Sequence, residues 1–164
     1  MPVEPLIDDD VGTVAAWLAR PDVHRWLDFG RGRQTIPAAG LMLMLRQDAQ
    51  RLWLVSDDDR RAVGVAALAD INPVFRSASL WYVIGDPRAL GRGHATRAVN
   101  FVLEQAFGPL ALHSVQAWSV EANLASIRVL EKNGFRTVGR QRACHVIDGQ
   151  FFDRVLFDRM RTDG

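Results

Sequence analysis

The sequence is poor in the features that mark secreted, membrane-spanning or nucleic-acid-coating proteins. Its 164 residues include a single cysteine, Cys144, so no internal disulfide can form. A net charge of only +1 provides no strongly basic surface, and no apolar run is long enough to cross a bilayer. The N-terminal segment carries acidic residues where a secretory signal peptide would carry basic ones. We therefore expect a cytoplasmic protein that binds neither nucleic acid nor a membrane.

Several kinds of catalytic site are also missing from the sequence. The Gly-Lys-Ser/Thr of a Walker loop does not occur, and the glycine-rich segment lacks the third small residue of a dinucleotide fingerprint. Ser126 lies outside any Gly-x-Ser-x-Gly elbow, and Cys144 has no base at a recognisable distance. The histidines share no metal-ligand spacing with one another or with the cysteine, so we expect no metal site. They are His24, His94, His113 and His145.

The composition is that of an ordinary globular protein, with 48% hydrophobic and 24% charged residues. A chain of this length can bury a sizeable core within one domain. It contains no internal repeat, low-complexity tract or linker-like segment. We therefore predict a single domain over residues 1–164.

The N-terminal third is expected to be mainly helical after a short extended piece near residues 3–7. The aspartates Asp8–Asp10 supply an N-cap and first-turn acids for a first helix, and residues 22–29 add a further turn or two. Thr35 as cap, with Pro37 in the first turn, starts a second helix. Two helical regions therefore precede the sheet.

A change of pattern in the second half predicts a mixed sheet. Strands over 51–56, 62–71 and 77–85 have short connections and are expected to be antiparallel. The remaining elements are a helix ending at Phe107, a strand over 112–120, a helix from Asn123 to Gly134 and a hairpin about Asp148-Gly149. The order β-α-α-β-β-β-α-β-α-β-β contains a strand–helix–strand unit, which requires a parallel pair joined by a right-handed crossover. The prediction is an α/β protein.

The stretch "RALGRGHATRAV", residues 88–99, is typical of an anion site. A helix that begins just after a glycine-rich turn presents unpaired N–H groups and the positive end of its dipole. Gly91 and Gly93 allow the backbone to approach a phosphate closely, and Arg88 or Arg92 could add a charge-assisted hydrogen bond. The sequence therefore indicates phosphate binding at this turn.

Two motifs together resemble the acetyl-CoA site of the GNAT superfamily of N-acetyltransferases, closest to its RimJ/RimL-like branch. They are "LGRGHA" (90–95) and "NLASIRVLEKNGF" (123–135). The resemblance implies that loop amides bind the CoA pyrophosphate, while pantetheine lies where strands 77–85 and 112–120, a central parallel pair, splay apart. One departure is Leu90, which stands where the family usually has Arg or Gln. The cofactor-binding residues implied are Tyr82, Val83, Ile84, Leu90, Gly91, Arg92, Gly93, His94, Ala95, Thr96, Asn123 and Ser126.

The resemblance implies direct attack of a primary amine on acetyl-CoA, a reaction with three roles to fill. A backbone N–H near residues 82–84 would polarise the thioester carbonyl. The family's usual Glu base is replaced by Ser79, and the replacements we expect, acting through water, are Asp70, His145 and Glu121. The usual Tyr acid is replaced by Leu130, which leaves Ser126 as the donor, with Tyr82, the one tyrosine, as the alternative.

The acceptor is expected to be a small molecule such as an amino sugar, because no acidic trough for a basic protein partner is visible. Aromatic walls could come from Trp26, Phe29, Phe75, Phe151 and Phe152, and contacts to an anionic acceptor from Arg31, Arg33 and Arg142. Three alternatives stay open: acetylation of protein N-termini, acyl-CoA binding without turnover, and a different nucleotide-binding α/β domain. A monomer or homodimer is expected.

Overall fold

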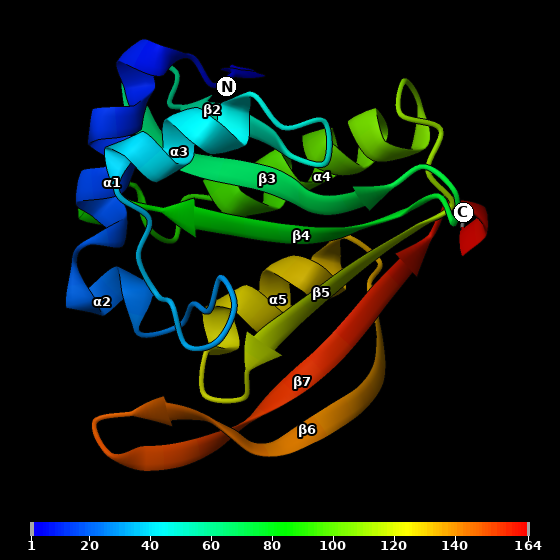
Figure 1. The fold of residues 1–164 in the computed structure, drawn as a ribbon. Coiled ribbons are helices and arrows are strands. Elements are labelled where there is room, and N and C mark those ends of the chain that lie inside the picture. The colour runs from blue at the N-terminus through cyan, green and yellow to red at the C-terminus, as the bar shows by residue number, and fades with distance from the viewer. Residues whose placement is uncertain (1, 164) are drawn as a thin grey trace.

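The computed structural model describes residues 2–163 and shows one seven-stranded mixed sheet with helices on both faces (Figure 1). The strands lie in the order β1-β2-β3-β4-β5-β7-β6. The strands are β1 (Val3–Pro5), β2 (Arg51–Ser56), β3 (Ala62–Asn72), β4 (Ser77–Ile84), β5 (Ser114–Val120), β6 (Arg136–Ile147) and β7 (Gln150–Met160). The helices are α1 (Val11–Leu18), α2 (Pro21–His24), α3 (Ala38–Leu45), α4 (His94–Phe107) and α5 (Leu124–Lys132). This order confirms the α/β prediction.

The two predicted helix starts differ from the structure in detail. Asp8–Asp10 form a separate 3₁₀ turn ahead of α1. Asp10 is the N-cap residue of α1 as predicted, but its carboxylate accepts a hydrogen bond from the Ile7 amide at 3.0 Å and makes no capping bond to that helix. Thr35 does not cap α3, because the helix begins at Ala38 with Pro37 as its N-cap residue. The fixed φ of proline favours this start without a side-chain cap.

The parallel pair at the centre of the sheet is held together only over the first three residues of each strand. β4 pairs with β5 at three positions, Ser77–Ser114, Ala78–Val115 and Ser79–Gln116. From Leu80 onward the two strands have no ladder between them, and they diverge visibly in Figure 1. The other neighbouring strands are antiparallel. The splay expected from the family resemblance is therefore present, and it opens toward the C-terminal ends of both strands.

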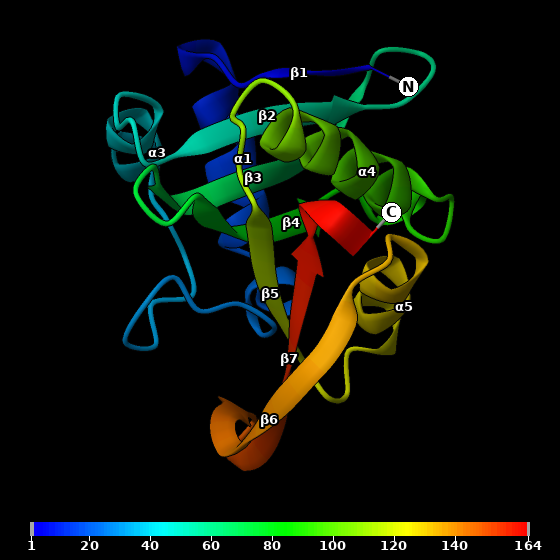
Figure 2. The same ribbon diagram turned by 90° about the vertical axis from the view of Figure 1, so that its right-hand side faces the viewer.

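Side chains alternate between two cores, one on each face of the sheet. On one face Val99 and Val102 of α4 pack with Leu80 of β4, and on the other Leu18 of α1 and Leu41 of α3 pack with Val83. Figure 2 shows α4 and α5 together on one face, with α1 behind the sheet. Along β4, Tyr82 therefore faces α4 and α5, whereas Trp81 faces α1 to α3.

Candidate functional site

The glycine turn before α4 is open to solvent and rich in free backbone donors. Gly91 and Gly93 have φ values of +72° and +80°, and residues 91–93 are exposed. The turn leads directly into α4, a helix of 14 residues whose dipole places partial positive charge at this end. An anion can therefore bind here through amides alone. The amides that donate to no group within residues 2–163 are those of Gly91, Arg92, Gly93, Ala95 and Thr96.

Arg97 folds back over this turn and was not singled out from the sequence. Its Nη2 donates to the Arg92 carbonyl at 3.1 Å and lies 3.4 Å from Nδ1 of the buried His94. The sequence signal that could have predicted this position is the spacing of four residues between Gly93 and Arg97, which places both on one side of the first helical turn. Arg88 is instead bound to Asp86 at 3.2 Å. Arg97 is therefore the cation that a side-chain hydrogen bond holds against this turn.

A surface pocket of about 570 Å³ adjoins the turn. Asn133, at the end of α5, bridges the two helices there, because its Nδ2 donates to the Thr96 carbonyl at 3.2 Å and to the Val129 carbonyl at 2.9 Å. Two cations, Arg97 and Lys132, border the pocket, and Lys132 is the only lysine of the chain. The pocket can therefore take a second anionic group next to the turn. Its lining residues are Val3, Thr96, Arg97, Asn100, Phe101, Lys132 and Asn133.

A hydroxyl pair spans the splay from β4 to α5. Tyr82 Oη lies 2.7 Å from Ser126 Oγ and 3.1 Å from the Ser126 carbonyl oxygen. Asn123 caps α5 by accepting a hydrogen bond from the Ser126 amide at 3.3 Å. Burial raises the pKa of Tyr82 to about 12, although its hydrogen bond with Ser126 opposes the rise. The phenol therefore keeps its proton near neutral pH, and the structure brings Tyr82, Asn123 and Ser126 together.

Replacing Asn123 by alanine is expected to lower the free energy of unfolding by about 1 kcal/mol, because the first turn of α5 loses its side-chain cap. The matched control is Asn100→Ala on α4, which loses only a surface hydrogen bond to Glu104 and is expected to cost less than about 0.5 kcal/mol. Denaturant unfolding compares the two variants. Equal effects would count against the capping role.

Asp70 is not brought to this site. It lies exposed in the bulge where the β3–β4 register shifts between Ala69 and Asn72, with φ of +52°. Its neighbour Ala69 is opposite Ser79, which precedes Tyr82 by about 10 Å of strand. Antiparallel pairing thus carries Asp70 to the end of the sheet away from the splay. The expectation that it acts as a base has no support in this geometry.

His145 is brought near the splay but both of its ring nitrogens are engaged. Arg154 donates to Nδ1 from Nη2 at 2.9 Å and from Nε at 3.2 Å, and Nε2 lies 2.7 Å from the Arg25 carbonyl. Because arginine only donates, Nδ1 is the acceptor and Nε2 carries the hydrogen. The ring is buried as well. His145 therefore has no lone pair available to a substrate, which removes the basis for its expected role as a base.

The same arginine fixes a loop across the splay, on the face opposite α4 and α5. Arg154 forms a largely buried ion pair with Asp28 at 3.0 Å and lies 4.0 Å from the centre of the Trp118 ring. Asp28 also accepts hydrogen bonds from the amides of Gly30 and Gly32. Phe29 meets Trp81 edge-on at 4.9 Å. We call residues 28–33, Trp81 and Trp118 the acceptor wall.

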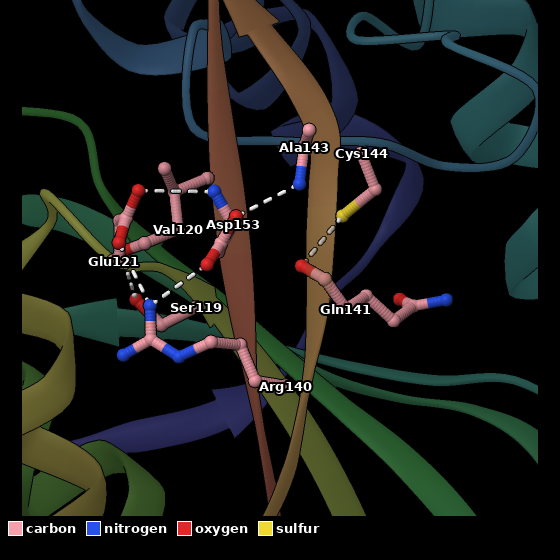
Figure 3. Close-up of polar contacts among 8 residues, drawn as sticks. All are labelled: Ser119, Val120, Glu121, Arg140, Gln141, Ala143, Cys144 and Asp153. Carbon is pink, nitrogen blue, oxygen red and sulfur yellow. Dashed lines mark hydrogen bonds and ion pairs between the residues drawn. The ribbon is translucent and has the colours of Figure 1, made fainter.

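Glu121 is also engaged, within a network at the end of β5 (Figure 3). It accepts hydrogen bonds from Arg140 at 2.8 Å and from the Asp153 amide at 3.1 Å. The Asp153 carboxylate in turn accepts from Arg140 at 3.0 Å and from the Ala143 amide at 2.8 Å. None of the three expected bases is therefore a free carboxylate or imidazole at the Tyr82–Ser126 pair.

The aromatic residues expected to line the acceptor site are dispersed. Phe29 belongs to the acceptor wall, whereas Phe75 is exposed in the β3–β4 turn at the far end of the sheet. Phe151 is exposed beside the β6–β7 turn with Phe152 next to it, and Trp26 stacks with Arg25 at 4.9 Å. Of these five aromatic residues, only Phe29 has a ring contact with the splayed part of β4, through Trp81.

No helix within residues 2–163 has both the length and the apolar character needed to cross a membrane. Over the same residues, no three His, Cys, Asp or Glu side chains gather in a way that could hold a metal ion.

Comparison with known proteins identifies the family. The family model "Acetyltransferase (GNAT) domain" matches residues 3–136. The probable N-acetyltransferase YjcK of Bacillus subtilis is 34% identical over 113 residues, which are 68% of this chain and 61% of that protein. The spermidine N(1)-acetyltransferase of Vibrio cholerae is 28% identical over 109 residues, 66% of this chain and 62% of that protein. Each match thus spans less than two thirds of the relative's own length.

The fold is also found in solved structures. A crystal structure of spermidine N-acetyltransferase from Vibrio cholerae in complex with CoA and spermine has a TM-score of 0.85 with this chain. The alignment is 20% identical and covers 99% of this chain and 96% of that one. Together with the matched family model, the shared fold shows that this chain belongs to the GNAT acetyltransferase family.

Proposed function

We propose that the protein transfers an acetyl group from acetyl-CoA to a primary amine of a small molecule. The observation that carries the proposal is the exposed turn at residues 91–93, whose free amides lie at the start of α4 beside the splay. The CoA bound to the Vibrio cholerae enzyme of the same fold supports it. The finer assignment to the RimJ/RimL-like branch rests only on the resemblance of the two motifs, residues 90–95 and 123–135.

The pyrophosphate would lie on the amides of residues 91–96 and the pantetheine along the open edge of β4. Beyond Ser79, the peptide groups of β4 that point toward β5 have no strand partner. Such a group can hold the pantetheine amides, and one N–H between Tyr82 and Ile84 can polarise the thioester carbonyl. This arrangement places the sulfur near Ser126, which we assign as the proton donor to the leaving thiolate.

The attacking amine enters from the acceptor wall as the neutral base. Because Asp70, His145 and Glu121 offer no free base at the Tyr82–Ser126 pair, the proton released by the amine passes to water. Direct attack needs no covalent acyl-enzyme intermediate, and Cys144, whose Sγ contacts the Gln141 carbonyl, is left without a role.

The charges around the acceptor wall favour an amine that is not a polycation. Asp28, the one carboxylate in the acceptor wall, is already paired with Arg154. A polyamine would need carboxylates free to receive its ammonium groups. Two arginines of the acceptor wall, Arg31 and Arg33, make no ion pair within residues 2–163. Arg142, on β6, lies outside the wall, and its charge acts on Asp153. We therefore propose an amine that carries an anionic group, such as a phosphorylated amino sugar, with protein N-termini as the second candidate.

Loss of the 3′-phosphate is expected to weaken CoA binding about tenfold, because we place that phosphate in the pocket between Arg97 and Lys132. The double variant Arg97→Gln/Lys132→Gln should bind CoA and dephospho-CoA with similar affinity. Calorimetry measures all four combinations. The control is Arg128→Gln, an exposed position on α5 outside the pocket, which should keep the difference. If the double variant still binds CoA more tightly than dephospho-CoA by the wild-type factor, the 3′-phosphate does not bind in this pocket.

The proposed function is tested by a thermal-shift screen followed by an amine panel. Acetyl-CoA should raise the melting temperature, because a ligand that binds only the folded state stabilises it. Thiol release should then follow with glucosamine 6-phosphate or O-phosphoethanolamine more readily than with glucosamine, ethanolamine or spermidine. Stabilisation without thiol release from any amine, protein N-terminal peptides included, would favour an acyl-CoA-binding module. Stabilisation by ATP or NAD but not by CoA would indicate another nucleotide-binding domain.

The assembly state stays an expectation, monomer or homodimer. The related enzyme of Vibrio cholerae has been described as a dodecamer, so the state of this chain is to be measured by light scattering.

A further inference from the structure

The only tyrosine of the chain stands in the splayed part of β4, three residues beyond the last β4–β5 pair at Ser79. Its ring crosses to the first turn of α5, where its hydroxyl meets Ser126. Burial raises the pKa of the phenol, and its hydrogen bond with Ser126 opposes the rise.

Either hydroxyl of the pair could be the donor at this distance, so the assignment of the hydrogens is part of the proposal. The Ser126 carbonyl is inside α5, where the amide four residues on is its regular donor. The closer acceptor for the Tyr82 hydrogen is Ser126 Oγ, at 2.7 Å. Within residues 2–163, Ser126 Oγ has no partner apart from Tyr82. Once Tyr82 donates to this oxygen, the hydrogen of Ser126 is left to point into the splay.

We propose that Tyr82 and Ser126 form a two-step proton relay to the leaving sulfur of CoA, with Ser126 as the donor and Tyr82 as the positioning residue behind it. The inference rests on the proposed acetyl transfer. The family resemblance implies that a tyrosine at the position of Leu130 usually protonates the thiolate. Here that position is a fully buried leucine, and the relay takes over its role. Ser126 and Tyr82, the two candidates for the general acid, thus act together in one relay.

The neutral amine attacks the thioester carbon, the C–N bond forms, and the C–S bond breaks with its electron pair on sulfur. Ser126 Oγ–H transfers its proton to the sulfur while Tyr82 Oη–H transfers its proton to Ser126 Oγ. The acceptor nitrogen loses its extra proton to water, and water returns one proton to the Tyr82 phenolate after CoA leaves.

The relay is favourable because it leaves the negative charge on the Tyr82 phenolate and not on a Ser126 alkoxide. Serine acting alone would be left as an alkoxide, and an aliphatic alcohol is a far weaker acid than a phenol. With Tyr82 behind it, the charge ends on a phenolate, whose conjugate acid has a pKa of about 12. Proton transfer to a thiolate, with a thiol pKa of about 8.5, is then unfavourable by only a few pKa units.

A double-mutant cycle tests the relay. Tyr82→Phe and Ser126→Ala should each lower kcat about 100-fold, and the double variant should be no slower than the slower single one, because a broken relay cannot be broken twice. Calorimetry should give an acetyl-CoA Kd within about threefold of wild type for all variants, which separates this loss from misfolding. Ser126→Thr, which keeps a hydroxyl, should retain kcat within about tenfold.

The outcomes separate the relay from its alternatives. If Ser126→Ala retains the wild-type kcat, Tyr82 protonates the sulfur directly, and if Tyr82→Phe retains it, Ser126 acts without Tyr82; either result overturns the relay. Multiplicative losses in the double variant would also overturn it. Ser119→Ala is the matched control, since it removes a buried hydroxyl bonded to the Val120 carbonyl and should leave kcat unchanged. No turnover by the wild type with any amine, despite acetyl-CoA binding, would instead overturn the proposed function.

Discussion

Replacing Gly93 by aspartate is expected to abolish acetyl-CoA binding, with an affinity loss of more than about 100-fold. The carboxylate would occupy the place of phosphate oxygens and repel them, a penalty of about 3 kcal/mol or more in a partly desolvated site. The φ of Gly93 is +80°, and an added Cβ would lie 3.0 Å from Nη1 of Arg97, so the flexible guanidinium must shift. Calorimetry with acetyl-CoA measures the loss.

The matched control is Gly93→Asn, which has the same shape without the charge. Asparagine tolerates the left-handed conformation, so its cost in folding stability is about 1 kcal/mol and close to that of aspartate. Acetyl-CoA binding by the asparagine variant should weaken by roughly tenfold only. Thermal melts of both variants show whether the fold is kept. If aspartate and asparagine weaken binding equally, charge at this position is irrelevant and the phosphates lie elsewhere.

Replacing Arg154 by methionine is expected to lower the free energy of unfolding by about 3 kcal/mol, because it breaks a largely buried ion pair and leaves Asp28 without its cation. The same change removes both donors to His145 Nδ1 and the cation over Trp118. Since the acceptor wall loses its anchor, KM for the amine should rise while Kd for acetyl-CoA stays within about threefold. Denaturant unfolding, calorimetry and steady-state kinetics provide the three measurements.

Arg140→Met is the control, because Arg140 also forms ion pairs, with Glu121 and Asp153, but its side chain is 50% exposed. It should cost less than about 1 kcal/mol. A similar loss in both variants would mean that the buried network around Arg154 adds nothing beyond an ordinary surface ion pair.

The stability contributed by Asp28 has a definite pH dependence. Burial alone would raise the pKa of Asp28, but hydrogen bonds from Arg154 and from the amides of Gly30 and Gly32 outweigh it, so the pKa lies below its ordinary value. A carboxyl group with a lowered folded-state pKa stabilises the fold above its unfolded pKa, about 3.9, and loses that contribution as pH falls through the folded value. The stability gap between the wild type and Arg154→Met should therefore narrow in acid.

Local patterns in the sequence predicted the elements of this fold well. Apolar residues at helical spacing mark α4, and Asn123 does cap α5, because both signals act within a few residues. The divergence of β4 and β5 was predicted from the family resemblance, which the glycine turn and the 123–135 motif carry. The boundaries of α3 were less readable, since Thr35 and Pro37 both offer plausible starts and only tertiary packing selects between them.

The positions of the catalytic candidates could not be predicted, because they depend on long-range contacts and sequence periodicity indicates only local structure. Asp70, an acid on the strand beside β4, lies at the end of the sheet away from the splay because of the antiparallel register. His145 had the right chemistry, but Arg154 and a distant carbonyl occupy its nitrogens. Conversely, the contact between Tyr82 and Ser126 joins residues 44 positions apart.

The central claim is that acetyl-CoA binds across the turn at residues 91–96 and the open edge of β4. The most direct test is a backbone-amide NMR titration of the isotope-labelled wild-type protein with acetyl-CoA. We expect the largest shift changes at residues 91–96, with a second group at 82–84. Saturable binding that leaves both groups unperturbed, or no binding at millimolar acetyl-CoA, would contradict the account.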